Sequence, residues 1–147
     1  MMIKNIPPTY LFLSLTYMMG VDFWVPGYAF MPGSSRWLGM SLAAAAGCLV
    51  MYVRLVMKKH QTTHTFDKST VVIEESFFSF SRNPIYLGMV LVLIGMCIWM
   101  NNVWTFLAPI FFFLVMQFKF IPFEEKKMEQ EVGAKYLEYK KRVRRWI

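Results

Sequence analysis

Charged side chains are scarce in this sequence of 147 residues, and one long stretch has none of them. Only 17% of the residues are charged and 56% are hydrophobic, whereas a soluble domain has about 25% charged and 45–50% apolar residues. No Asp, Glu, Lys or Arg lies between Asn83 and Phe118. These shortages exclude an ordinary soluble enzyme and a disordered chain. They predict one membrane-embedded domain that comprises residues 1–147.

Cysteine and histidine are rare as well, with two of each. Cys48 and Cys97 lie inside hydrophobic runs and form no C-x-x-C pair, which excludes a disulfide-rich secreted module and favours packed apolar thiols. His60 and His64 could share a metal ion, but the sequence offers no third ligand nearby. We therefore predict that the protein has no metal site.

Four hydrophobic runs predict an all-α integral membrane fold, because a spanning helix needs roughly 20 apolar residues. The expected transmembrane helices comprise residues 8–25, 37–57, 84–100 and 102–121. Only Asn101-Asn102 separates the last two, so they are expected to form a hairpin whose ends lie on the same side. A C-terminal amphipathic cytoplasmic helix is expected at about residues 122–146. The alternative, buried helices of a soluble bundle, would require polar faces that these runs lack.

The basic residues predict the orientation in the membrane. Lys and Arg outnumber Asp and Glu by 16 to 9, and every Lys and Arg except Arg36 lies at one end of the expected spans. The positive-inside rule therefore places both termini and the loop at residues 58–84 in the cytoplasm, which in a prokaryote means the plasma or inner membrane. Since the charge flanks hydrophobic runs, it indicates contact with a membrane surface rather than with nucleic acid.

Small residues recur at every fourth position of the second run, at Gly39, Ala43 and Gly47. Such a stripe lets two helices approach closely. The partner helix could belong to the same chain or to a second copy in a homodimer.

The segment from Ser81 to Gly88 predicts a helix start at the cytoplasmic surface. Asn is a favoured N-cap and Pro suits the first helical position, so Asn83 is expected to cap the third helix and Pro84 to open it. The unpaired N–H groups of such a start can bind a carboxylate or a phosphate. The alternative is that these residues only form a stable helix start.

The C-terminal tail carries a hydrophobic stripe on an otherwise charged sequence. Pro122 is expected to interrupt the fourth span, with Glu124 and Glu125 in the first turn of a new helix. Beyond them, apolar residues recur at three- and four-residue steps: Met128, Val132, Tyr136, Tyr139, Val143 and Trp146. This pattern is typical of an amphipathic helix that lies on a membrane.

Two motifs in the C-terminal half are separated by the charge-free hairpin. The first reads Arg82-Asn83-Pro84-Ile85-Tyr86-Leu87-Gly88. The second begins with Glu124-Glu125 and continues, after seven residues, with Gly133, Tyr136, Tyr139 and a basic end. Over about residues 62–146, the chain resembles the membrane methyltransferases related to isoprenylcysteine carboxyl methyltransferase and phospholipid N-methyltransferase.

The resemblance implies an S-adenosylmethionine-dependent methyltransferase that acts at the cytoplasmic face on a lipophilic acceptor, either a membrane lipid or a lipophilic small molecule. It implies that the cofactor contacts Thr70, Val71, Val72, Ile73, Phe78, Asn83, Pro84, Ile85, Tyr86 and Glu124. Asn83 and Glu124 are therefore expected to meet in space. Phe120 stands where the carboxyl-methylating relatives have an arginine, with Lys119 beside it. No catalytic side chain is assigned, because methyl transfer mainly requires alignment of donor and acceptor.

Two other functions are compatible with the sequence. The first is a non-catalytic small membrane protein whose basic tail binds anionic lipid or a protein partner. The second is a membrane reductase on the same scaffold, although the chain has no G-x-G-x-x-G motif.

Overall fold

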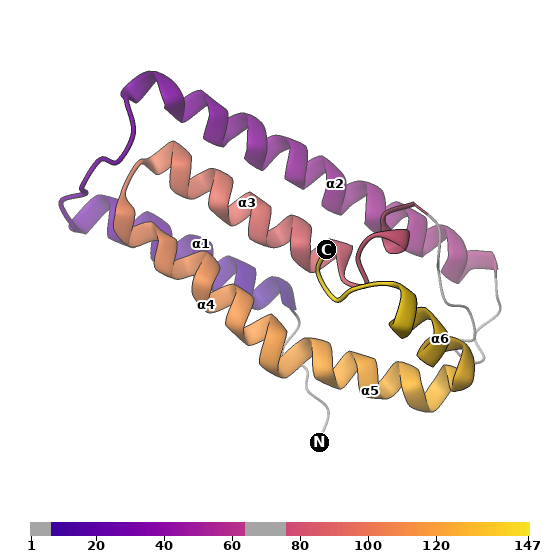
Figure 1. The fold of residues 1–147 in the computed structure, drawn as a ribbon. Helices are drawn as coiled ribbons and strands as arrows, with labels where there is room; N and C mark the ends of the chain where they lie inside the picture. Colours follow the sequence, from indigo (N-terminus) through magenta and orange to yellow (C-terminus); the bar gives the residue numbers. More distant parts are fainter. Residues whose placement is uncertain (1–6, 64–75) are drawn as a thin grey trace.

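The computed structural model describes residues 7–63 and 76–147, and these residues form helices and turns with no β-strand. The helices are α1 (Pro7–Trp24), α2 (Arg36–Thr63), α3 (Pro84–Met100), α4 (Leu107–Val115), α5 (Ile121–Val132) and α6 (Ala134–Arg142). Figure 1 shows α1 to α4 side by side in an elongated bundle, with α5 extending α4 beyond one end and α6 folded back beside α5. The predicted all-α class is confirmed.

The hairpin of α3 and α4 is stabilised at its turn by two buried asparagines. Asn101 adopts the left-handed conformation with φ 55° and ends α3. Its Oδ1 accepts hydrogen bonds from the Phe30 and Met31 backbone N–H groups at 3.1 and 3.0 Å. Asn102 Oδ1 accepts from Trp104 N at 3.2 Å and so caps the 3₁₀ turn Val103–Phe106 that precedes α4. The hairpin therefore returns to the end at which α3 begins (Figure 1).

The small residues of α2 pack against α3 within the chain. A Cβ added to Gly39 would lie 2.5 Å from the Gly95 carbonyl oxygen, and one added to Gly95 would lie 2.6 Å from Ala43 N. Gly47 has no atom within 4 Å of such a Cβ and takes no part in this contact. The close approach expected for the stripe is therefore made by α3 at Gly39 and Ala43, with Gly95 as the facing glycine.

Gly39→Ala is expected to destabilise the bundle, although alanine favours helices more than glycine does. The added methyl group would meet backbone atoms, and such overpacking costs about 1–3 kcal/mol. We expect the melting temperature in detergent to fall by about 5 °C. Gly47→Ala is the matched control and should keep or raise it. Equal melting temperatures for the two variants would contradict this packing.

The tail differs from the single helix expected at residues 122–146. Gly133 has φ 67°, which ends α5, and α6 ends at Arg142. Pro122 was expected to interrupt the fourth span, and this is wrong. The π-helical turn Met116–Phe120 joins α4 to α5 without a break in the helical backbone. A π-turn shifts the backbone hydrogen-bond pattern locally, so the missing N–H of a proline can be accommodated there.

The hydrophobic stripe of the tail packs inside the protein. Tyr136 and Tyr139 are buried, with Met128, Val132 and Val143 packed against them, so the stripe joins α5 to α6. Trp146 returns to the main core, where its ring centroid lies 4.8 Å from that of Phe113. The expectation that this stripe lies on the membrane is therefore wrong, because the helical period is the same whether the apolar face meets lipid or another helix.

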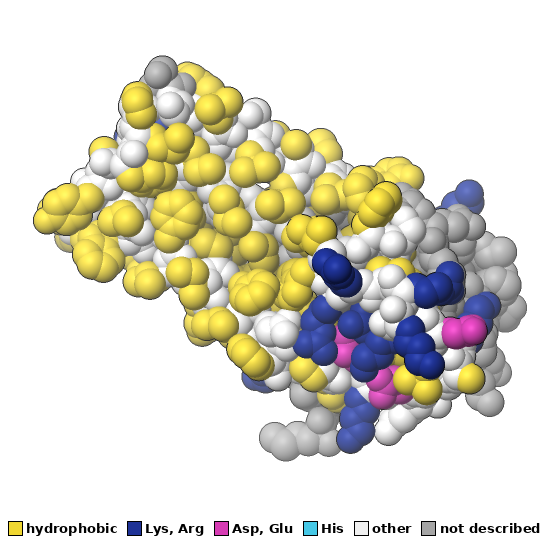
Figure 2. Space-filling view, viewed as in Figure 1, with side chains coloured by type: hydrophobic (Ala, Val, Ile, Leu, Met, Phe, Trp, Pro, Cys, Tyr) yellow, Lys and Arg dark blue, Asp and Glu magenta, His cyan; other side chains and the backbone are white. Residues whose placement is uncertain are grey.

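Two helical stretches, Arg36–Lys59 and Val103–Val132, are long and apolar enough to cross a membrane, and Pro84–Met100 is apolar but shorter. Figure 2 shows hydrophobic side chains over most of the visible face of the bundle, while the charged side chains gather at the end formed by α5 and α6. A count of four spans stays a prediction.

Candidate functional site

A pocket of about 300 Å³ lies at the charged end of the bundle. It is lined by Pro7, Pro8, Arg54, Met57, Phe78, Arg82, Asn83, Pro84, Ile85, Tyr86, Met89 and Glu124. These residues come from the starts of α1 and α3, the C-terminal half of α2, the turn Ser76–Ser79 and the first turn of α5. The arrangement follows from the hairpin, because α5 continues α4 back past the start of α3.

Six of the residues predicted from the sequence line this one pocket: Phe78, Asn83, Pro84, Ile85, Tyr86 and Glu124. The expectation that Asn83 and Glu124 meet in space is therefore confirmed. The other four predicted residues, Thr70, Val71, Val72 and Ile73, lie outside the described part of the chain.

Tyr86 and Glu124 connect α3 directly to α5. The buried Tyr86 hydroxyl donates a hydrogen bond of 2.5 Å to Glu124 Oε1. Glu124 lies in the first turn of α5, where the helix dipole favours its negative charge. Among the described residues no group donates to Glu124 Oε2, so this oxygen can accept a hydrogen bond from a ligand.

Asn83 occupies the N-cap position of α3, but its side chain does not cap the helix. Instead its Nδ2 donates to the Arg145 carbonyl oxygen at 3.0 Å, and its backbone N–H donates to Ser81 Oγ at 3.1 Å. The predicted capping bond is therefore wrong, since the C-terminal segment competes for the amide. The first turn of α3 has no side-chain cap, which keeps it suited to an anionic group.

Glu125 is the centre of an ion-pair cluster that sequence reasoning did not assign. Its side chain is buried, with 6% of the residue exposed. Arg145 donates to both carboxylate oxygens, from Nε at 3.0 Å and from Nη2 at 2.8 Å. Arg82 Nη1 lies 3.0 Å from Oε1, and Lys140 Nζ lies 3.5 Å from Oε2. The hydrogen bond with Glu125 raises the pKa of Arg145, so this pair is ionised at neutral pH.

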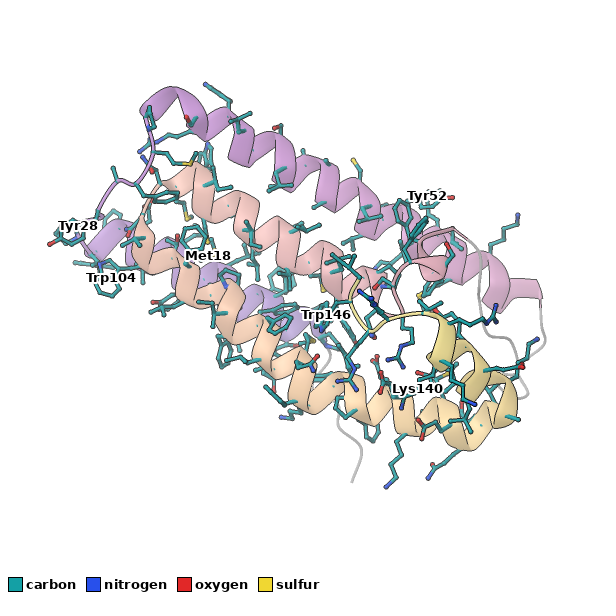
Figure 3. The ribbon with its side chains drawn as sticks, in the orientation of Figure 1. Met18, Tyr28, Tyr52, Trp104, Lys140 and Trp146 are labelled. Atoms are coloured by element: carbon teal, nitrogen blue, oxygen red, sulfur yellow. The ribbon has the colours of Figure 1, made fainter. Side chains whose placement is uncertain are left out.

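Residues 143–146, which we call the C-terminal strap, hold the segment that forms one wall of the pocket. The Arg82 backbone N–H donates to the Arg144 carbonyl oxygen at 3.0 Å. At the other end of this wall, the Tyr139 hydroxyl donates to the Phe78 carbonyl oxygen at 2.7 Å. The strap itself is fixed by Trp146, whose Nε1 donates to Gln117 Oε1 at 2.8 Å. Figure 3 shows Trp146 turned back toward the centre of the molecule.

Several pocket residues were not predicted as site residues. Arg82 is part of the first motif, and Pro7-Pro8 marks the entry of α1, so both had a signal in the sequence. Met57 and Met89 resemble ordinary apolar residues of a span. Arg54 is a charged residue within the second hydrophobic run, which was the only available signal for it.

Comparison with known proteins places the chain in a family. The sequence profile of the phospholipid methyltransferase family matches residues 34–135, which include the first motif and the first part of the second, with Glu124. A protein of Haemophilus influenzae (strain ATCC 51907 / DSM 11121 / KW20 / Rd), described only as uncharacterized, is 37% identical over 62 residues, which are 42% of this chain and 98% of that protein. No solved structure matches the chain. With its apolar helices and this match, the chain is a membrane protein that belongs to the phospholipid methyltransferase family.

Proposed function

We propose that the protein is an S-adenosylmethionine-dependent methyltransferase that acts on a lipophilic acceptor at the cytoplasmic face of the membrane. The observation that supports this best is the single pocket that unites the two motifs, with Asn83 from one and Glu124 from the other. A purely structural role would not require both motifs to line the same cavity.

The groups around the pocket fit the parts of S-adenosylmethionine. The Glu124 carboxylate can accept from the ammonium group or from the ribose hydroxyls. The uncapped start of α3 and the guanidinium of Arg82, whose Nε has no hydrogen-bond partner among the described residues, can bind the carboxylate. Phe78 and Tyr86 offer aromatic rings for the adenine or for the sulfonium cation. A volume of about 300 Å³ is at the lower end of the range for small-molecule sites.

In this proposal, the pocket residues mainly position the reactants and exclude water. When bound, S-adenosylmethionine supplies a methyl carbon that accepts a lone pair from the acceptor while the carbon–sulfur bond breaks and its electron pair stays on sulfur. The hydrogen bond from Tyr86 fixes the orientation of the Glu124 carboxylate. Met57 and Met89 make part of the wall apolar. A carboxylate or thiolate acceptor needs no general base, and an amine only has to be neutral.

The orientation in the membrane is part of the proposal. Both termini and the pocket lie on the cytoplasmic side, and the acceptor enters from the bilayer, which would be the plasma or inner membrane of a prokaryote. The chain crosses the membrane four times, with α1 and α3 as the two shorter spans. The contribution of Thr70, Val71, Val72 and Ile73 to cofactor binding belongs to the same proposal.

A methyl-transfer screen tests the function. The purified protein in vesicles would be incubated with S-adenosylmethionine labelled in its methyl group, together with lipids extracted from cells. We expect label to appear in one organic-soluble product, and boiled protein should give none. If label never enters the organic phase with any extract, a lipophilic acceptor is excluded.

The alternative of a lipid-binding basic tail gains no support from the described residues. Lys140 and Arg145 are engaged by Glu125, and the strap is packed against the pocket wall. A homodimer through the small-residue stripe gains no support either, because α3 of the same chain already packs against Gly39 and Ala43.

A further inference from the structure

A second cavity, of about 330 Å³, lies between α1 and α4, which run side by side in the bundle (Figure 1). It is lined by Leu13, Ser14, Tyr17, Leu107, Ala108 and Phe111, and it shares no residue with the pocket at the charged end. Ser14 and Ala108 are buried and form its floor, while the other four side chains are exposed and form its walls. The cavity is therefore an apolar groove that opens toward the lipid.

The Ser14 hydroxyl is a buried donor without an acceptor. The residue is only 2% exposed, and its Oγ has no hydrogen-bond partner among the residues that the structure describes. The described chain breaks off only at the charged end of the bundle, whereas Ser14 lies about two turns inside α1, counted from Pro7. An unpaired buried hydroxyl costs free energy, so one in a native structure requires an explanation.

Thr16, in the same helix, shows how such a hydroxyl is usually satisfied. Its Oγ1 donates to the Phe12 carbonyl oxygen at 2.9 Å, four residues earlier in the chain. The equivalent acceptor for Ser14 is the Tyr10 carbonyl oxygen, but the two form no hydrogen bond. The Ser14 hydroxyl is therefore directed away from its own helix, toward the space between α1 and α4 in which the groove lies.

Tyr10 and Lys119 indicate the depth of Ser14 in the membrane. Lys119 is the first charged residue after the charge-free stretch, and its Nζ donates to the Tyr10 hydroxyl at 3.2 Å. Lysine and tyrosine side chains at the end of a span lie where the headgroups meet the hydrocarbon region. Ser14 follows Tyr10 by one turn, which is about 6 Å along α1, away from the charged end. It therefore lies at the depth of the ester groups and the upper acyl chains of lipids.

We propose that the groove binds one acyl chain of a bilayer lipid and that the Ser14 hydroxyl donates a hydrogen bond to the ester carbonyl oxygen of this chain. The apolar walls accept the hydrocarbon, and the carbonyl supplies the acceptor that the described residues do not offer to Ser14. This lipid site is separate from the pocket proposed for the methyl donor. Its occupant is held as a part of the membrane and is not the molecule that receives the methyl group.

Binding of two neutral single-chain lipids to the full-length protein tests this inference. The probes are monooleoylglycerol and its ether analogue, which share one chain and differ only in the ester carbonyl. Dissociation constants would be measured by native mass spectrometry from a neutral detergent, with and without S-adenosylhomocysteine. The preference for the ester should be about 2- to 10-fold larger in the parent than in Ser14→Ala, because one neutral hydrogen bond is lost. S-adenosylhomocysteine should leave this preference unchanged.

Thr16→Ala is the matched control, because it removes a hydroxyl of the same helix that is already bonded to its own backbone. This variant should keep the ester preference of the parent. In lipid-free detergent, Ser14→Ala should melt at the temperature of the parent or above it, since the change removes an unpaired buried hydroxyl. The melting curves also show that both variants are folded.

Four results would overturn the assignment. The first is an ester preference that survives Ser14→Ala, and the second is one that Thr16→Ala removes equally. The third is a clear fall in the melting temperature of lipid-free Ser14→Ala, which would mean that Ser14 has a partner within the protein. The fourth is binding of neither lipid; if the protein is then a dimer, a second copy of the chain covers the groove. An ester preference that S-adenosylhomocysteine abolishes would place the lipid in the other pocket and so contradict the proposal as well.

Discussion

Glu125→Gln is expected to lower the melting temperature of the purified protein by on the order of 10 °C. Glu125 is buried and pairs with Arg82, Arg145 and Lys140, so the change leaves largely buried guanidinium groups without their counter-ion. Removing one partner of a buried ion pair costs about 3–5 kcal/mol, and each kcal/mol corresponds to about 2–4 °C in a domain of this size. The measurement is thermal unfolding in detergent.

Glu129→Gln provides the matched control for Glu125→Gln. Glu129 also pairs with Lys140, at 2.7 Å, but both side chains are about one third exposed. An exposed pair contributes about 0–1 kcal/mol, so this variant should melt close to the parent. If the two variants melt alike, the C-terminal strap is not anchored through Glu125.

Glu124→Gln is expected to weaken the binding of S-adenosylhomocysteine about 10- to 100-fold and to leave the melting temperature nearly unchanged. The amide oxygen can still accept from the Tyr86 hydroxyl, so the contact between α3 and α5 persists. What is lost is the charge on the oxygen that faces the ligand, and a charge-assisted hydrogen bond contributes about 1.5–3 kcal/mol. The dissociation constant and the melting temperature would be measured on the same preparation.

Glu129→Gln and Glu138→Gln are the controls for this affinity, because neither residue lines the pocket. The competing interpretation is that Glu124 only stabilises the start of α5. Its replacement would then cost about 0.5–1 kcal/mol of stability and leave the affinity of the parent intact. Unchanged binding by Glu124→Gln would show that the cofactor assignment is wrong even though the family is established.

The helices of the bundle could be predicted because the sequence leaves few alternatives. The stretch from Asn83 to Phe118 has no charge, and its only polar break is Asn101-Asn102. A hairpin of two helices gives the backbone N–H and C=O groups of such a stretch their hydrogen bonds inside a membrane. The observed α3, Pro84–Met100, has the expected bounds. The motifs at the two ends of this hairpin then had to meet, which is why Asn83 and Glu124 could be assigned to one pocket.

The tail and the details of the site could not be predicted in the same way. Glycine is unfavourable in the interior of a helix, but only the structure shows that the positive φ of Gly133 separates α5 from α6. The side chain of Asn83 has two competing partners, its own helix and the Arg145 carbonyl, and the sequence cannot rank them. Glu125 and Arg54 depend on contacts between segments that are distant in the sequence, so their surroundings become visible only in the fold.

Calorimetric titration of the detergent-purified protein with S-adenosylhomocysteine tests the central claim, that this pocket holds the methyl donor. The account predicts saturable binding at one site per chain, with a dissociation constant within the range of about 1 μM–1 mM that is usual for enzyme substrates. Lack of saturable binding over that range would contradict it.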